Sequence, residues 1–114
     1  MTRELKKLLF KDIFPLYVNK VERNGHTKQE LIDMLYWLCG YDEEQIETYM
    51  DKNVDLETFF INCPKLNPNR KNVTGTICKV KVQDIEDETI QNIRIMDKLV
   101  DDIAKGKKKQ IWKS

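Results

Sequence analysis

Residues 27–40, Thr-Lys-Gln-Glu-Leu-Ile-Asp-Met-Leu-Tyr-Trp-Leu-Cys-Gly, carry the signals that decide the fold. Thr27 and Glu30 form a capping-box pattern, in which the threonine oxygen and the glutamate carboxylate each accept a hydrogen bond from a backbone N–H at the helix start. Four apolar residues follow at intervals of three and four and therefore share one helix face: Leu31, Met34, Leu35 and Leu38. Gly40 can then adopt the left-handed conformation that ends a helix. The stretch predicts an amphipathic helix with one buried face.

Similar signals predict four more helices. Asp12 is expected to cap a helix that carries Pro15 in its first turn, where proline is tolerated, and that ends at Gly25. The other three predicted helices follow the capping residues Asp42, Asp55 and Asp87. We therefore expect a mainly α fold, a compact bundle of about five helices, with residues 1–106 as one helical domain.

The segment after residue 63 is expected to be less regular. Residues 64–76 are rich in Pro, Asn and Gly and predict a long loop, the kind of segment that often carries function. Apolar and polar residues then alternate, so residues 77–83 predict a short strand or hairpin. A lone strand needs a partner, either an N-terminal segment or a second copy, and a helix is the alternative.

Composition points to a globular protein of the cytoplasm. The chain has 114 residues, of which 40% are hydrophobic and 34% are charged. No apolar run approaches the roughly 18 residues that cross a membrane, and the N-terminus lacks the pattern of a secretion signal. Three cysteines are an odd number, which favours reduced thiols over a disulfide framework. Residues 107–114 are expected to form a disordered basic tail.

Charge is distributed in blocks of alternating sign. Such blocks suggest acidic and basic surfaces that face each other within a chain or between chains, although separate solvated helix faces would give the same pattern. The net charge is +4 over residues 1–28, −8 over 29–62, +5 over 63–81, −5 over 82–104 and +5 over 105–114.

The residues typical of metal sites and nucleophiles do not form a recognisable motif. Cys39, Cys63, Cys78 and His26 lack the close pairs that zinc sites use, so neither a metal nor a cofactor is expected. Nothing in the sequence brings a thiol to His26 as its base. A small enzyme that uses acids such as Asp84 and Glu86, or the Cys78 thiol, within residues 78–87 is kept as an alternative function.

A second alternative is a binder of nucleic acid or of a phosphorylated ligand through the basic loop 65–81. Basic side chains next to aromatic rings suit phosphates and unpaired bases. The isoelectric point of about 7.6 argues against nucleic acid as the partner. The candidate ligand-binding residues are Arg70, Lys71, Lys79, Lys81, Trp37 and Tyr41.

The leading hypothesis is a non-enzymatic interaction protein that self-associates, for example as a homodimer. Charge complementarity between blocks would contribute, together with an apolar seam on the last helix. The seam would otherwise be the share of the core that this helix supplies. It consists of Ile93, Met96, Val100 and Ile103.

Several short motifs together are similar to a known family. They are residues 37–41 (WLCGY), 66–70 (LNPNR), 82–87 (VQDIED) and 97–101 (DKLVD), with Gly106 near the end. Between about Phe14 and Gly106 the chain resembles the bacterial family known as domain of unknown function 2200. In that family threonine often stands at the position of Cys39 and glycine at that of Lys79, which weakens a catalytic role for Cys39 and a tight-turn role for Lys79. The resemblance implies a small stand-alone bacterial protein and assigns it no activity, cofactor or partner.

Overall fold

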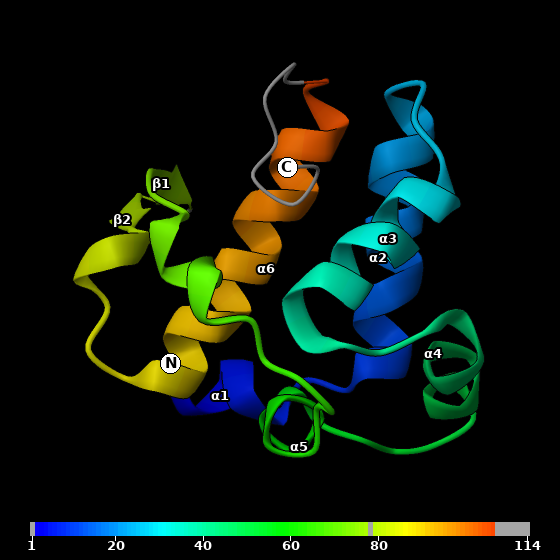
Figure 1. Ribbon diagram of the computed structural model, residues 1–114, viewed down its shortest axis with the longest axis horizontal. Helices are drawn as coiled ribbons and strands as arrows, with labels where there is room; N and C mark the ends of the chain where they lie inside the picture. The colour runs from blue at the N-terminus through cyan, green and yellow to red at the C-terminus, as the bar shows by residue number, and fades with distance from the viewer. Residues whose placement is uncertain (1, 78, 107–114) are drawn as a thin grey trace.

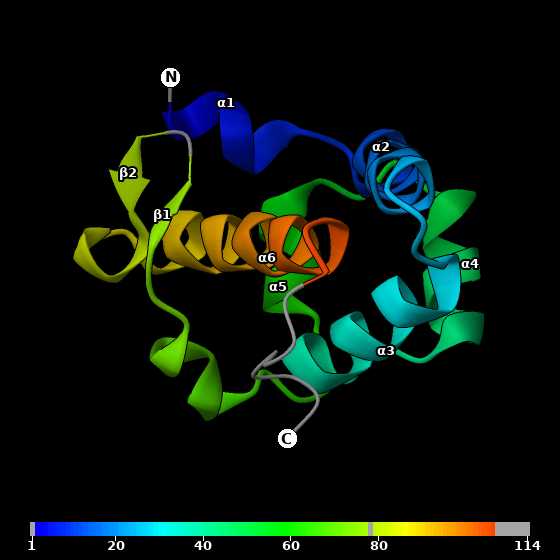
Figure 2. The same cartoon turned by 90° about the horizontal axis from the view of Figure 1, so that it is seen from above.

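Helix α6 is the central element of the fold, and the other helices are arranged around it (Figure 1; Figure 2). The computed structural model describes residues 2–77 and 79–106, so the predicted tail 107–114 lies outside the described residues. Within the described residues the α-helices are α1 (Thr2–Lys7), α2 (Phe10–Arg23), α3 (Lys28–Cys39), α4 (Glu43–Met50), α5 (Leu56–Ile61) and α6 (Glu88–Ala104). Helices α1, α2, α3 and α5 all contact α6, whereas α4 packs against α2. The predicted mainly helical fold is confirmed.

The apolar face of α6 forms the middle of the core. Ile93, Met96, Val100 and Ile103, the predicted seam, are each at most 1% exposed. They pack among the buried residues of α2, α3 and α5. In the single chain these four residues are therefore core, and a surface for self-association must be made by other residues.

The predicted helix over residues 28–39 is present as α3. The Thr27 hydroxyl accepts a hydrogen bond from the backbone N–H of Glu30 at 3.2 Å, and the Glu30 carboxylate accepts one from the backbone N–H of Thr27 at 3.3 Å. Gly40 ends the helix with a φ of 81°. The predicted capping residues of α4, α5 and α6 are confirmed as well: Asp42, Asp55 and Asp87.

The start of α2 differs from the prediction. The helix begins at Phe10 with Leu9 at its N-cap, so Asp12 lies in the first turn and does not cap it. Pro15 consequently lies inside the helix. Backbone contacts with the segment before α5 set this earlier start, because the Phe10 N–H donates to the Val54 carbonyl at 2.8 Å. The Phe10 ring also stacks on Phe59 of α5, with centroids 4.4 Å apart.

Helix α1 was not predicted. A six-residue helix is too short to be stable alone, so tertiary contacts must hold it in place. Leu5 packs against the core, and the Lys6 ammonium lies 2.8 Å from the Asp87 carboxylate at the start of α6.

The predicted irregular region contains a 3₁₀ turn and a hairpin. Pro68–Asn72 forms the 3₁₀ turn, which the sequence did not predict inside the loop. The hairpin joins β1 (Thr76–Ile77) and β2 (Val80–Lys81), which pair antiparallel. A hairpin was predicted here, and its partner strand is internal, not an N-terminal segment.

Lys79 corrects the expectation that came from the family resemblance. Its φ is 66°, a left-handed conformation in the connection between β1 and β2. Lysine thus occupies a tight-turn conformation that glycine adopts more easily. The second strand also ends sooner than predicted, at Lys81, because a second 3₁₀ turn begins at the buried Val82 and runs to Asp84.

Over residues 2–77 and 79–106, no helix is both long enough and apolar enough to cross a bilayer.

Candidate functional site

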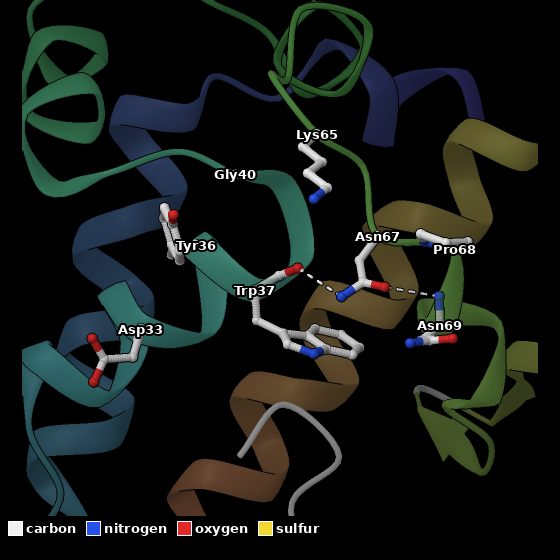
Figure 3. Close-up of a pocket in the computed structure, with 8 residues that line it drawn as sticks. All are labelled: Asp33, Tyr36, Trp37, Gly40, Lys65, Asn67, Pro68 and Asn69. Atoms are coloured by element: carbon white, nitrogen blue, oxygen red, sulfur yellow. Dashed lines mark hydrogen bonds between the residues drawn. The ribbon is translucent and has the colours of Figure 1, made fainter. Parts of the chain in front are cut away.

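A cleft of about 690 Å³ lies between α3 and the segment that follows α5 (Figure 3). Asp33, Tyr36, Trp37 and Gly40 line it from the α3 side, and the opposite side is formed by residues 65–69. We call it the α3 cleft. Figure 3 shows the Trp37 ring beside Asn67 and Asn69, with Tyr36 and Asp33 farther along the helix.

Backbone and amide hydrogen bonds attach residues 65–69 to the end of α3. The Lys65 N–H donates to the Cys39 carbonyl and the Asn67 N–H to the Leu38 carbonyl, both at 2.9 Å. The Asn67 side-chain amide donates to the Trp37 carbonyl at 3.1 Å, and its oxygen accepts from the Asn69 N–H at 2.8 Å. These bonds satisfy carbonyls that the end of a helix leaves without a partner. They also set the width of the α3 cleft.

Gly40 allows this close approach. A Cβ atom at Gly40 would lie 3.0 Å from the backbone nitrogen of Lys65, which is tighter than nine in ten real Cβ contacts. The φ of 81° would also strain any other residue. Two separate requirements therefore favour glycine at the wall of the α3 cleft.

The α3 cleft offers aromatic surface and a few polar groups. Tyr36 is 63% exposed, because it lies on the polar side of α3. Trp37 is half-buried and presents its ring to the cleft. Exposed tyrosine and tryptophan beside polar side chains are typical of sites that bind other proteins.

A second hollow of about 410 Å³ continues past Tyr36 and is acidic. Asp33 and Tyr36 line both hollows, and Asp42 and Glu43 of the α4 start line only the second. We call the combined surface of Asp33, Tyr36, Trp37, Asp42 and Glu43 the acidic aromatic face. Lys65 is the cation that lines the α3 cleft.

The acidic block 29–62 is largely without internal charge partners. Of its nine acids, Glu57 pairs with Lys6 and Glu30 with His26. The other seven form no ion pair with any described residue, and all but Asp55 are exposed. They are Asp33, Asp42, Glu43, Glu44, Glu47, Asp51 and Asp55. Their negative potential is therefore directed at solvent, where it attracts cations and repels nucleic acid.

Two of the predicted ligand-binding residues are engaged in the fold. Arg70 is 7% exposed, and its guanidinium donates to Asn92 at 2.8 Å, to the Asn67 carbonyl at 3.0 Å and to Glu88 at 2.9 Å. The Lys71 ammonium donates to Gln91 of α6. These side chains connect the 3₁₀ turn at residues 68–72 to α6.

The other four predicted ligand-binding residues lie in three different places. Lys79 and Lys81 are exposed on the hairpin. Tyr41 is buried and donates its hydroxyl proton to the Phe59 carbonyl at 2.7 Å. Trp37 alone lines the α3 cleft. The predicted set therefore does not form one basic surface.

Sequence analysis missed most of the α3 cleft. Asp33 and Tyr36 line it but were not predicted as site residues, whereas Lys65, Asn67 and Asn69 belong to the predicted binding loop 65–81 without having been named individually. Tyr36 could have been found, because a tyrosine on the polar side of an amphipathic helix is exposed. The loop residues could not, since no local pattern shows that residues 65–69 pair with the end of α3.

The acids proposed for a small enzyme are dispersed over the surface. Asp84 and Glu86 are exposed, and Cys78 lies outside the described residues. Asp87 caps α6, and its carboxylate contacts Lys6. Among the side chains that are described, no group of three His, Cys, Asp or Glu residues could hold a metal ion.

Comparison with known proteins gives the family of the chain. A family model described as "Uncharacterized protein conserved in bacteria (DUF2200)" matches residues 4–112. The chain belongs to this family. Among solved structures, the chain is similar to the crystal structure of the uncharacterized protein SP1917, with 36% sequence identity and a TM-score of 0.88. The similarity covers 94% of this chain and 88% of that one. No curated protein matches the chain.

Proposed function

We propose that this DUF2200 chain is a non-enzymatic interaction protein that self-associates, in which the acidic aromatic face of one copy binds the lysine-rich residues 105–114 of another. The observation that carries the proposal is the group of exposed acids in block 29–62 that form no ion pair with the described residues, next to exposed Tyr36. Acids beside aromatic rings suit the lysine side chain, because the carboxylates attract its charge and the rings attract both its charge and its stem.

The partner segment has the complementary composition. Residues 105–114 contain five lysines and no acid, and Ile111 and Trp112 add apolar surface. An apolar pair between lysines suits the α3 cleft, whose aromatic ring lies beside acidic groups.

The position where α6 ends supports the same proposal. Gly106 lies beside His26, close to the start of α3, since a Cβ atom at Gly106 would be 3.2 Å from His26 Nε2. Eight further residues span up to about 26 Å when extended. Twelve residues of α3 extend about 18 Å. A reciprocal exchange between two copies is therefore within reach and would give a symmetric homodimer.

Charge reversal with complementation tests the proposal. Asp33→Lys with Glu43→Lys should abolish the dimer, and so should Lys107→Glu with Lys108→Glu. Each variant fails because like charges face each other, whereas a mixture of the two variants should form a heterodimer. The measurement is native mass spectrometry of each variant and of the mixture. A heterodimer in the mixture would show that both variants are folded and that their charges contact each other, because misfolded chains would not regain association on mixing.

A matched control keeps the net charge change and moves it elsewhere. Glu22→Lys with Glu86→Lys adds the same charge on exposed positions outside the acidic aromatic face. This variant should dimerise like the natural chain. Loss of association in the control, or a mixture that stays monomeric, would contradict the proposal.

We also infer a cytoplasmic location. Cys39 and Cys63 are free thiols in the described part of the chain, which supports a reducing compartment. Cell fractionation with a C-terminal epitope should recover the protein in the cytosolic fraction, and its recovery elsewhere would contradict the inference.

A further inference from the structure

Two cysteines that are 24 positions apart meet behind the α3 cleft. Cys39 is the last residue of α3, and Cys63 follows α5. The backbone bond from Lys65 to the Cys39 carbonyl brings the second cysteine to the end of α3. Cys63 packs against the hydrophobic core cluster that contains Cys39.

The two thiols have different environments. Cys39 has no exposed surface, whereas Cys63 is half-buried at the edge of the core. The hydrogen bond from Cys39, together with the positive charge of Arg70, lowers the pKa of Cys63 to about 7. Burial raises the pKa of Cys39. Near neutral pH Cys63 is therefore more readily the nucleophilic thiolate than an ordinary cysteine, whereas Cys39 favours the thiol.

We propose that Cys39 and Cys63 form a reversible disulfide on reaction with a hydroperoxide, with Cys63 as the attacking thiol and Cys39 as the resolving thiol. The partial exposure of Cys63 admits a small oxidant, and the contact with Cys39 supplies a second sulfur at once. A buried cysteine alone would be inert, and an exposed one alone would have no partner within its own chain.

The chemistry balances with hydrogen peroxide as the two-electron oxidant. The Cys63 thiolate attacks one peroxide oxygen, the O–O bond breaks, and a sulfenic acid and hydroxide form. Hydroxide takes the Cys39 proton to give water. The Cys39 thiolate then attacks the Cys63 sulfur, the S–O bond breaks, and the departing oxygen leaves as water after protonation. Two thiols and one peroxide thus give one disulfide and two waters, and a dithiol reductant restores the thiols by exchange.

A disulfide between Cys39 and Cys63 would affect the α3 cleft. Gly40 and Lys65 line the cleft and are close in sequence to the two cysteines. A disulfide would add a covalent link beside the hydrogen bonds that hold residues 65–69 on α3. Oxidation is therefore expected to raise the Tm by several degrees.

Peptide mapping of the full chain tests the proposal directly. After treatment with one equivalent of hydrogen peroxide, unfolding and alkylation, the Cys39 and Cys63 peptides should appear as one cross-linked species that has lost two hydrogens. A dithiol reductant should restore both free thiols. A Cys78→Ser variant is the matched control and should behave like the natural chain. Free Cys39 and Cys63 after treatment, or disulfides between chains through Cys63, would overturn the proposal.

A second measurement tests the roles of the two sulfurs. In the Cys78→Ser background the alkylation rate of Cys63 should rise with a midpoint near its pKa of about 7. Cys39→Ala removes the hydrogen-bond donor, so the midpoint should move toward the ordinary thiol value, and a sulfenic acid at Cys63 should accumulate and react with dimedone. An unchanged midpoint with no trapped sulfenic acid would overturn the assignment. The peptide map of the natural chain remains decisive if the alanine variant does not fold.

Discussion

At the scale of single residues, Arg70 joins the 3₁₀ turn at residues 68–72 to α6. Its side chain is 7% exposed, and its guanidinium donates to Asn92, which is itself buried. The same guanidinium contacts Glu88, about twenty positions later in the chain, so the role of Arg70 is set by tertiary packing.

Arg70→Ala should therefore reduce stability and not merely ligand affinity. Removing the guanidinium leaves the buried amide oxygen of Asn92 without its donor, although the Asn67 carbonyl keeps the bond from the backbone N–H of residue 70. The free energy of unfolding should fall by about 2–4 kcal/mol. Urea unfolding measures it, with Lys79→Ala as the exposed control, for which the change should stay within about 0.5 kcal/mol. Equal effects of the two substitutions would contradict the structural role.

Asp97 is a residue whose burial gives a pH dependence of defined sign. Burial raises the pKa of its carboxyl above the ordinary value, although the Tyr17 hydroxyl donates to it and Arg94 lies nearby. An acid with a raised folded-state pKa adds stability below the unfolded pKa and loses that contribution as the pH rises through the folded value. Asp97 therefore favours folding more in acid than at neutral pH.

Comparison with Asp97→Asn isolates this contribution. The difference in unfolding free energy, natural chain minus variant, should become more positive as the pH is lowered from 7 toward 4, because only the natural chain takes up the proton. Urea unfolding at several pH values provides the measurement. A difference that is constant with pH, or that changes in the opposite direction, would contradict a raised pKa.

At the scale of elements, local sequence signals predicted the long helices. They did not predict the elements whose position depends on tertiary contacts. The capping box at Thr27, the spacing of apolar residues in α3 and the cap at Asp87 are local, and each was confirmed. Helix α1 and the early start of α2 depend on packing against α5 and α6. The α3 cleft likewise depends on a pairing between residues 65–69 and α3 that no local pattern encodes.

Two glycines separate the effect of helix-end conformation from that of close packing. Gly25 and Gly40 have similar φ values, 84° and 81°. A Cβ atom at Gly25 would meet no atom within 4 Å, whereas a Cβ atom at Gly40 would lie 3.0 Å from the Lys65 nitrogen. Gly25→Ala should lower the unfolding free energy by about 1 kcal/mol. Gly40→Ala should lower it by at least about 1 kcal/mol more, because the loop must move. Equal losses in thermal or urea unfolding would contradict the close approach at the α3 cleft.

At the scale of the whole molecule, the alternating charge blocks were compatible either with facing surfaces or with separate solvated helix faces, and the structure pairs some of them. The basic N-terminal block pairs with the acidic block of α6 through Lys6–Asp87 and Lys20–Asp101, and Arg70 pairs with Glu88. Most acids of the block 29–62 form no ion pair with the described residues. The sequence gives the charge of each block but does not show which blocks lie next to each other in space. It therefore could not identify the block that remains available to a partner.

The most direct test of self-association is the solution mass of the natural chain by light scattering, measured over a range of protein concentrations at low and high salt. We expect a dimer at low salt that dissociates near 1 M salt, where the screening length falls to about 3 Å and the contact between lysines and carboxylates weakens. A monomer at every concentration and salt level would contradict self-association. A dimer that is indifferent to salt would contradict the acidic aromatic face as its contact.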